Sequence, residues 1–457
     1  MIAPLTAHAE SVRRALSQGA RTAIQLADQL GVSQPTVSRA LAALGGDVLR
    51  IGAARSIHYL LKDARRRFGD FPVYRVNAAG GITPLGVLTP VCPAGFVMQQ
   101  ADGVVRHSEG LPWWLDDMRP QGFLGRAYVA RHGQALGLPD TLAAWGDDHT
   151  VRALLAHGHD AVGNLLLGER ARDAFVHAPP PVPLTAAEQA DAFVALAGDA
   201  ARGEAPGSSA GGEQPKFAAC VASRVHGGQH VLVKFTLPDT APDGGNPVTE
   251  RWRDLLLAEH LALQALADAG VDAARSQLFD HAGQRFLIVH RFDRVGLHGR
   301  RAVHSLAALN AEFVGLAAEP WPVKAQRLQA LCHISRDAAA GAALLWAFGR
   351  LIGNTDMHDG NLSFVAEHGR PCALAPAYDM LPMAFAPSAG GGLPGALAPI
   401  TLHASVGNAV WRDAWLLAQA WLQRVRADMR FSPRFAPCVD ALAQHLADAA
   451  GKVARLG

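Results

Sequence analysis

Cysteine is scarce in this sequence, and the few cysteines present form no recognisable site. The five of them lie far apart among the 457 residues, with no CxxC pair and no zinc-like spacing. This argues against a disulfide framework and favours reduced thiols in the cytosol. The chain also begins without a basic stretch followed by a long apolar run, so we expect no signal peptide and a cytoplasmic protein.

Long apolar runs are also missing. The most apolar stretch, residues 338–352, contains Arg350 and is shorter than the roughly 20 residues that a membrane-spanning helix needs. We therefore expect a buried helix at this place and no membrane partner.

Two phosphate-binding motifs of other protein classes do not occur. The chain has no GxxxxGK[ST] loop, which argues against a P-loop nucleotidase. It also lacks the DxGxT motif and the cysteine-rich zinc site of helix-turn-helix repressors with a sugar-kinase fold. A nucleotide site, if present, must therefore be built in another way.

The overall net charge of +2 hides an uneven distribution. Residues 1–70 hold ten basic and five acidic side chains, a net charge of +5. A basic terminal module on a mildly acidic body suggests a polyanionic partner for that module alone. We expect this partner to be double-stranded DNA.

The chain is long enough for two or three domains. Residues 1–70 have the pattern of short helices followed by a hairpin, and residues 71–178 begin with β-like segments. A proline-rich break at 177–183 precedes residues 184–457, where strand and helix patterns alternate and the end is helical. The expected fold class is a mixed one, α/β in its alternation and α+β overall.

The basic module contains a helix-turn-helix pattern. Ile24, Ala27 and Leu30 share one helical face, and Gly31 can end that helix in the left-handed conformation. Ser33 can cap a second helix that presents short polar and basic side chains near its start, as reading of a major groove requires. The expected DNA-contacting residues of this helix are Gln34, Thr36, Ser38 and Arg39.

A hairpin is predicted after the second helix. Two β-like segments at 48–51 and 56–61 flank a short loop, which would form a wing with Arg55 near its tip as a further DNA contact. The alternative is a helical module that mediates only protein contacts. The coincidence of the basic excess with the motif favours DNA.

The body carries residues in the order that a phosphotransfer site requires. A glycine-rich loop at 207–216 can bring backbone N–H groups close to phosphate oxygens, although flexible surface loops have the same composition. Lys234 lies within an apolar strand and Glu259 on a predicted helix at 252–269, the pairing that holds phosphates in protein kinases. By itself, Lys234 could also be an edge-strand residue with a snorkelling stem.

A catalytic loop and a metal ligand follow. Asp356 and Asn361 have the D-x-x-x-x-N spacing in which the Asp accepts a hydroxyl proton and the Asn binds Mg²⁺. Asp379 follows a short apolar stretch, where the second Mg²⁺ ligand of a kinase lies. The sequence thus predicts ATP and Mg²⁺ as cofactors. A zinc site of His358 with Asp356 and Asp359 is the alternative, but no further ligand set accompanies it, so a structural role of His358 is favoured.

Several segments resemble the HipA-like Ser/Thr kinase toxins, from about Phe71 to the C-terminus. Residues 209–216 resemble that family's Ser-x-x-Gly-x-Gln-x-Lys loop, 290–294 its Glu-Arg-Phe-Asp-Arg segment, 354–361 its Asn-Thr-Asp-x-His-x-x-Asn loop, and 377–379 its metal-binding Tyr-Asp. His290 replaces the usual acidic residue, and Gly360 stands where a lysine is common. The fused helix-turn-helix is similar to the YjjJ-type subgroup, whereas the family usually borrows this domain from a separate antitoxin.

The resemblance implies a serine/threonine protein kinase: a winged helix-turn-helix (1–70), a small β-rich subdomain (71–178) and a bilobal core (184–457) with a mostly helical C-terminal lobe. Asp356 would be the catalytic base, and Asn361 and Asp379 the Mg²⁺ ligands. Ser209, or less favourably Ser208, would be an inhibitory autophosphorylation site, because a phosphate there opposes the phosphates of ATP. The implied ATP-binding residues are Ser209, Gly211, Gly212, Gln214, Lys216, Lys234, Glu259, His290 and Phe292.

The partners expected besides DNA are a protein substrate and possible contacts with an antitoxin and a second copy of the chain. Two other functions stay open at this point. The chain could be a DNA-binding regulator whose degenerate kinase fold senses a nucleotide without transferring phosphate. It could also be a small-molecule phosphotransferase, since those enzymes share the Asp and Asn spacing.

Overall fold

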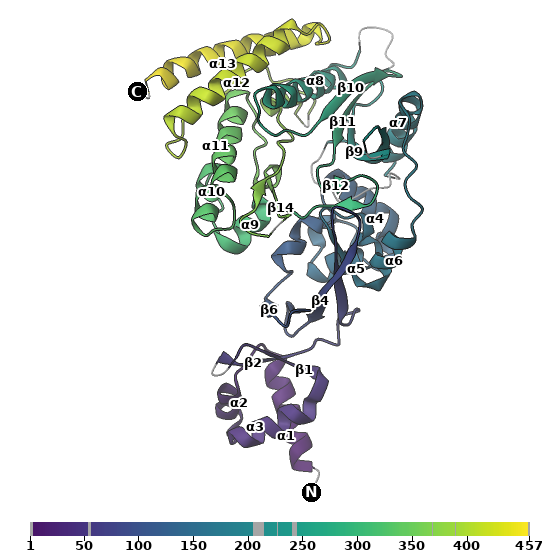
Figure 1. Cartoon of the computed structure of the whole chain (residues 1–457), viewed down its shortest axis with the longest axis vertical. Helices are drawn as coiled ribbons and strands as arrows, with labels where there is room; N and C mark the ends of the chain where they lie inside the picture. The colour runs from purple at the N-terminus through teal and green to yellow at the C-terminus, as the bar shows by residue number, and fades with distance from the viewer. Residues whose placement is uncertain are drawn as a thin grey trace.

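The computed structural model describes residues 3–53, 56–203, 214–225, 227–239, 245–367, 369–388 and 390–455, with the side chains from residue 7 onward. Three parts follow one another along the long axis of the molecule (Figure 1). A small helical module lies at the N-terminal end, a β-rich part lies in the middle, and a larger two-lobed body lies at the other end. The mixed α+β fold class is confirmed.

The N-terminal module is a winged helix-turn-helix. Gly31 ends the second helix with φ 64°. Ser33 is the N-cap residue of the third helix, but its hydroxyl pairs with that of Thr36 at 2.9 Å instead of accepting a backbone N–H. The prediction for Ile24 is wrong, because its side chain is 59% exposed while Leu26 is buried. The elements are α1 (Ala3–Leu16), α2 (Ala23–Leu30), α3 (Gln34–Leu44) and an antiparallel hairpin of β1 (Val48–Ile51) and β2 (His58–Leu61).

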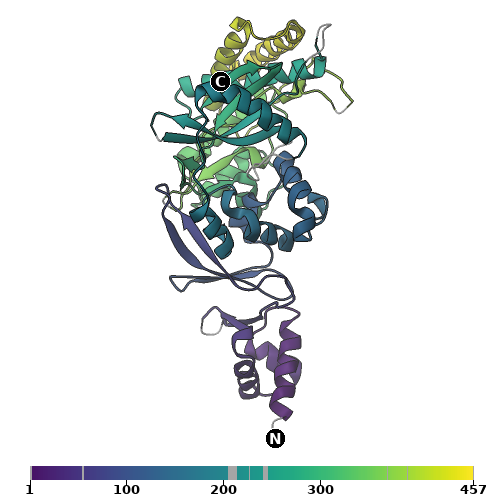
Figure 2. The ribbon, with the colours of Figure 1, turned by 90° about the vertical axis from the view of Figure 1, so that its right-hand side faces the viewer.

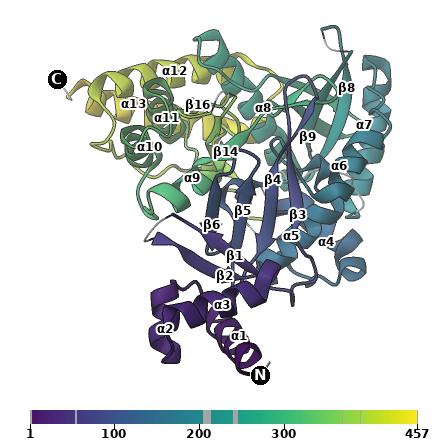
Figure 3. The same ribbon diagram turned by 60° about the horizontal axis from the view of Figure 1, so that its bottom comes forward.

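The wing hairpin is packed against the middle part of the molecule. Leu49 and Leu60 of the hairpin form one apolar cluster with Val91 and Val97 of the neighbouring sheet. The backbone N–H of Cys92 donates to the carbonyl of Leu61 at 2.9 Å. Figure 3 shows the hairpin lying between α3 and the end of this sheet. One face of the wing is therefore an interdomain contact.

The middle part is a five-stranded antiparallel sheet with helices beside it (Figure 2). The strand order is β6-β5-β4-β3-β7, so the short last strand pairs with the first one. The strands are β3 (Phe71–Val76), β4 (Ile82–Pro90), β5 (Phe96–Gln100), β6 (Val105–Ser108) and β7 (Leu165–Leu167), and the helices are α4 (Gly122–Leu136), α5 (Asp147–His157) and α6 (Gly168–His177).

The smaller lobe of the body is a four-stranded antiparallel sheet in the order β10-β11-β9-β8. Phe193 of α7, Phe217, Phe235 and Phe286 form much of its apolar core. A long helix, α8, packs against this sheet, with Leu256 in contact with β11 residues. The bounds are α7 (Ala186–Ala201), β8 (Lys216–Ser223), β9 (Gly227–Phe235), α8 (Pro247–Asp268), β10 (Ser276–His281) and β11 (Gln284–His290).

The larger lobe is mostly helical and shares one apolar core with α8. The predicted buried helix at 338–352 is confirmed as α11. Among the described residues, no helix has the length and apolar character to cross a membrane. The elements are α9 (Leu306–Phe313), α10 (Trp321–Ala330), α11 (Arg336–Leu351), α12 (Asn408–Ala427), α13 (Ala436–Ala454), a hairpin of β12 (Arg294–Val295) and β13 (Gly299–Arg300), and a sheet of β14 (Val303–Ser305), β15 (Ser363–Val365) and β16 (Ala373–Leu374).

Candidate active site

Lysine is rare in this chain, and most of the few lysines are buried in the body. The sequence contains five lysines. Lys216, Lys234 and Lys324 are 4%, 6% and 3% exposed. A buried ammonium group is costly unless charged or polar partners surround it, so each of these residues marks a place where negative groups converge.

Lys234 joins two carboxylates from different elements. Its Nζ donates to both carboxylate oxygens of Glu259 at 2.7 Å and also contacts the Asp379 carboxylate. Lys234 lies on the central strand β9, and Glu259 lies on α8 with 0% exposure. The contact predicted between this lysine and this glutamate is thus present, and Asp379 joins it from the other lobe.

A second lysine lies beside this cluster. In the β8–β9 register, Lys216 is directly opposite Lys234. Burial acts to raise the pKa of Asp379, but the ammonium groups of Lys234 and Lys216 outweigh it and hold this pKa below its usual value. Burial raises the pKa of Glu259 against the opposing effect of Lys234. Asp379 is therefore ionised and available as a hard oxygen ligand.

Asn354 ties the predicted catalytic loop to Asp379. Its side-chain amide donates to the carbonyl of Asp379 at 3.1 Å, and its Oδ1 accepts the backbone N–H of Asp356 at 3.0 Å. Asp379 has φ 54°, a left-handed conformation that Asp tolerates better than most residues do. Sequence reasoning gave Asn354 no role, although it stands in the quoted motif.

The predicted base and the predicted metal ligand lie side by side on this loop. The Asn361 amide donates from Nδ2 to the carbonyl of Asp356 at 2.8 Å, which leaves its Oδ1 for another partner. Asp356 is exposed, and within the described part of the chain its carboxylate makes no hydrogen bond or ion pair. It is therefore free to accept a proton from an incoming hydroxyl.

Tyr378 also holds this loop in place. Its hydroxyl donates to the carbonyl of Gly360 at 2.7 Å and pairs with the Ser363 hydroxyl at 2.8 Å. Its ring lies 5.6 Å from that of Phe292, which follows β11. His290 at the end of β11 is half-buried, and burial, with Arg275 nearby, lowers its pKa, so its imidazole is neutral at pH 7.

Lys324 anchors the catalytic loop in a way that the sequence did not suggest. Its ammonium, on α10, lies 2.9 and 2.7 Å from the two carboxylate oxygens of Asp359. Asn310 of α9 adds a longer contact to the same carboxylate at 3.4 Å. A lone lysine in a helical pattern carries no signal of such a partner, so only tertiary structure reveals it.

Two side chains of the zinc alternative, His358 and Asp359, have partners within the chain. Among the described residues, no group of three or more His, Cys, Asp or Glu side chains could hold a metal ion. Asp359 is paired with Lys324, and the His358 ring accepts the N–H of Gly360 on Nδ1 at 3.0 Å. A Cβ atom at Gly360 would lie 2.8 Å from the same ring. His358 therefore has the structural role expected of it.

The predicted glycine-rich loop is described only from Gln214 onward. Ser208, Ser209, Gly211 and Gly212 lie outside the described residues, as does Arg55 of the wing. Gln214 is described, and its Nε2 is buried without a hydrogen-bond partner. Gln214 lies two positions before Lys216 in the chain, and a buried unpaired donor such as its Nε2 can bind an anionic ligand.

The predicted nucleotide segment 290–294 also holds the middle part to the body. The Arg294 guanidinium donates to the carbonyls of Ala161 and Gly163 at 2.7 and 3.0 Å, and Asp293 accepts the N–H of Gly163 at 3.2 Å. Arg291 pairs with Asp293 at 2.8 Å. All three side chains are buried. Sequence reasoning assigned these charges no structural role.

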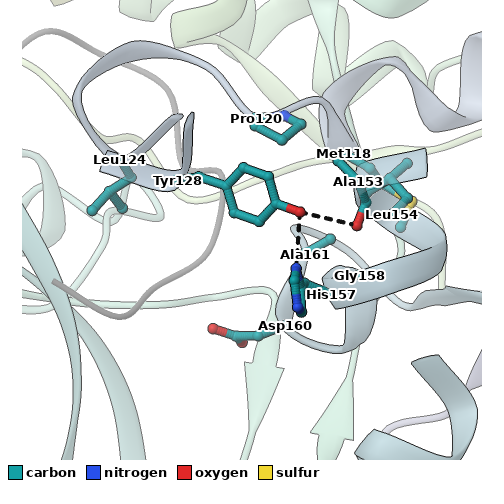
Figure 4. A pocket seen from close by; sticks show the side chains of 10 residues that line it. All are labelled: Met118, Pro120, Leu124, Tyr128, Ala153, Leu154, His157, Gly158, Asp160 and Ala161. Atoms are coloured by element: carbon teal, nitrogen blue, oxygen red, sulfur yellow. Dashed lines mark hydrogen bonds between the residues drawn. The ribbon is translucent and has the colours of Figure 1, made fainter. Parts of the chain in front are cut away.

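A small cavity in the middle part lies next to this contact (Figure 4). Its volume is about 40 Å³, too small for a nucleotide. The Tyr128 hydroxyl points toward His157, with its oxygen 3.0 Å from Nδ1, and Asp160 lines the same space. Burial lowers the pKa of His157 to about 4. We assign this cavity no part in the site.

The predicted DNA-contacting side chains lie together near the start of α3. Gln34, Ser38 and Arg39 are exposed, and Thr36 is half-buried. The Arg39 guanidinium folds back toward its own helix, 3.3 Å from the Pro35 carbonyl and 3.4 Å from the Thr36 hydroxyl. The Arg39 side chain would have to change its rotamer and swing away from the helix to reach a base.

Sequence relatives share all three parts of this architecture. A family model for the HipA-like C-terminal domain matches residues 208–450, one for the middle domain of YjjJ-like toxins matches 68–176, and one for bacterial regulatory proteins of the arsR family matches 14–46. "Toxin YjjJ" of Escherichia coli (strain K12) is 38% identical over 444 residues, which cover 97% of this chain and 98% of that protein. The chain belongs to the YjjJ-like group of the HipA-like family.

Two solved structures show a more distant likeness. One is the complex of the Shewanella oneidensis MR-1 toxin–antitoxin system (HipA, HipB and operator DNA), with a TM-score of 0.48, 12% identity and coverage of 84% of this chain and 97% of that one. The other is the Helicobacter pylori proinflammatory kinase CtkA, with a TM-score of 0.35, 11% identity and coverage of 53% and 90%. The family assignment rests on the sequence relatives alone.

Proposed function

We propose that this HipA-like protein is an ATP- and Mg²⁺-dependent serine/threonine protein kinase that also binds DNA through its N-terminal module. The observation that carries the proposal is the convergence of Lys234, Glu259 and Asp379, with Asp356 and Asn361 on the adjoining loop. These five residues come from four separate segments of the chain. Lys234, Asp356 and Asp379 supply charged groups and Asn361 a free acceptor oxygen, as a kinase site requires, and Glu259 positions Lys234.

The residues fit a nucleotide with its metal ion. Lys216 and Lys234 would bind phosphate oxygens, and the orphaned Nε2 of Gln214 offers a further donor. Asp379 and the free Oδ1 of Asn361 are the few hard oxygens that protein Mg²⁺ sites supply. Bound Mg-ATP provides the phosphoryl group and neutralises its developing charge.

The chain's own residues then position and deprotonate the acceptor. Asp356 accepts the proton of a Ser or Thr hydroxyl on a protein substrate, which makes the oxygen a better nucleophile. Asn354, Tyr378 and Lys324 hold the loop in place through the bonds described above. Glu259 keeps the Lys234 ammonium between the lobes.

The glycine-rich loop provides the proposed regulation. Ser209 lies in the segment that would hold the phosphates of ATP. Its phosphorylation would add nearly two negative charges at this place and oppose nucleotide binding. The kinase would then inactivate itself, since the transferred phosphate blocks the site of its donor.

The experiment incubates the purified full chain with ATP labelled at the γ-phosphate and with a cell lysate, with and without Mg²⁺. We expect Mg²⁺-dependent labelling of Ser or Thr in proteins, and its loss in Lys234→Met. Lys62→Met is the matched control, because Lys62 forms an ion pair with Asp70 near the protein surface and lies in a different part of the chain from Lys234. A wild-type chain that binds ATP and labels nothing supports the nonhydrolysing regulator instead, and one that labels only small molecules supports the small-molecule phosphotransferase.

A further inference from the structure

A cavity opens on the larger lobe directly beside the catalytic loop. It has a volume of about 550 Å³, within the size range of clefts that bind ligands. We call it the acceptor groove. The side chains that line it include Glu319, Lys324, Met357, His358, Asp359 and His403.

The position of the acceptor groove relative to Asp356 follows from the chain. Met357, His358 and Asp359 come immediately after Asp356 and form one wall. Asp356 itself is exposed, whereas Lys216 and Lys234 are buried. A protein segment that brings a hydroxyl to Asp356 would therefore have room for its flanking residues in this groove.

The opposite wall is preformed. Asn310 holds the segment between α9 and α10 by two bonds to Leu316, of 3.0 and 3.1 Å. The Lys324 ammonium donates to the carbonyl of Ala317 at 3.2 Å while it binds Asp359. The same two side chains thus fix both walls, so the groove exists before any partner binds.

The charges of the acceptor groove do not cancel. Lys324 and Asp359 neutralise each other. His358 and His403 accept N–H groups on Nδ1, from Gly360 at 3.0 Å and Ser405 at 3.2 Å. Glu319 is exposed, and in the described part of the chain it forms no ion pair.

We propose that the acceptor groove binds the substrate segment next to the phosphorylated Ser or Thr, and that Glu319 selects a lysine or arginine in that segment. The proposal rests on the kinase activity proposed above. Charge complementarity carries it, because Glu319 leaves the groove negative and the neighbouring Asp356 carboxylate adds to this sign. The chemical class of the substrate is then a protein segment with a basic residue close to its hydroxyl.

A peptide library tests this assignment. Peptides with one Ser or Thr and a fixed residue at each flanking position are phosphorylated by the wild-type full chain, by Glu319→Lys and by Glu312→Lys. Glu312 is the matched control, since it is an exposed glutamate of the same lobe that does not line the groove. Thermal unfolding and ATP affinity are measured for all three proteins.

We expect the wild type and Glu312→Lys to prefer Lys or Arg at one or more flanking positions. Glu319→Lys should lose about tenfold in kcat/KM on those peptides, because a partly exposed attraction becomes a repulsion, and should gain on peptides with Asp or Glu there. A wild-type preference for neutral or acidic flanks, or an unchanged basic preference in Glu319→Lys, overturns the groove assignment while the kinase activity stands. A wild type that binds ATP but phosphorylates no peptide or protein refutes the kinase activity and the groove together.

Discussion

Replacement of Lys324 by methionine tests how the catalytic loop is held. Lys324 is 3% exposed, and its ammonium is bound to both oxygens of Asp359, whose side chain is 19% exposed. Methionine has a similar length but leaves this carboxylate with only the longer contact to Asn310. Removal of one partner of a buried ion pair costs about 3–5 kcal/mol, and the partial exposure of Asp359 favours the lower end, about 3 kcal/mol.

Lys324→Met should also lower the rate of phosphotransfer, with little effect on ATP affinity. Loss of the anchor moves the loop that carries Asp356, and a displacement of about 1 Å can lower a rate by about 10²-fold. ATP affinity should change little, because Lys234 and Asp379 do not contact Lys324. The assays are urea denaturation followed by fluorescence, phosphotransfer at saturating ATP, and calorimetric titration with ATP.

Two further variants make the reasoning refutable. Lys62→Met removes a lysine from a surface pair with Asp70, which should cost no more than about 1 kcal/mol. Lys324→Met with Asp359→Asn removes both charges and should recover much of the lost stability, since neither group is then left unpaired. If Lys324→Met is as stable as Lys62→Met, or if the double variant is no more stable than Lys324→Met, the ion pair does not anchor the loop.

Three other outcomes are expected. Arg39→Ala should weaken binding of the full chain to a selected duplex by about 1–3 kcal/mol if it reads a guanine, and salt should weaken binding steeply; salt-independent binding in a mobility-shift assay contradicts this. Burial, with Arg370 nearby, lowers the pKa of His304 from 6.5 to about 4. As the pH drops from 6.5 to 4, His304 is therefore protonated in the unfolded chain but not in the folded one, and the free energy of unfolding falls. His304→Phe should reduce this fall by up to about 3 kcal/mol, and an unchanged pH profile of urea denaturation argues against it. Mass spectrometry should find phosphate on Ser209 in the wild type and none in Asp356→Asn; a wild type without phosphate between residues 207 and 216, or a Ser209→Asp variant that binds ATP normally, removes the proposed regulation.

The order of the site residues along the chain could be predicted from the sequence. The Asp356 and Asn361 spacing, the strand lysine and the helix glutamate are local signals, and the structure brings Lys234 and Glu259 together as expected. The start of α8 was missed by five residues, although its signal was present. Asn246 caps the helix by accepting the N–H of Val248 at 2.9 Å, and Pro247 follows it.

The contacts between the parts could not be predicted in this way. The Lys324 anchor joins residues 35 positions apart, and the Arg294 contacts join residues more than 130 positions apart. Charged side chains are usually solvated, so their sequence pattern gives no sign of burial. The burial predicted for Ile24 was wrong because helical spacing of apolar residues does not show which of them a neighbouring helix covers.

The central claim is that Asp356 takes the proton of a protein hydroxyl while separate residues bind the nucleotide. Single-turnover transfer from labelled ATP to protein, measured with wild type and Asp356→Asn at saturating Mg-ATP, tests it most directly. We predict that Asp356→Asn keeps its fold and its ATP affinity but transfers phosphate about 10²–10⁴-fold more slowly. An Asp356→Asn protein that transfers phosphate as fast as the wild type would contradict it.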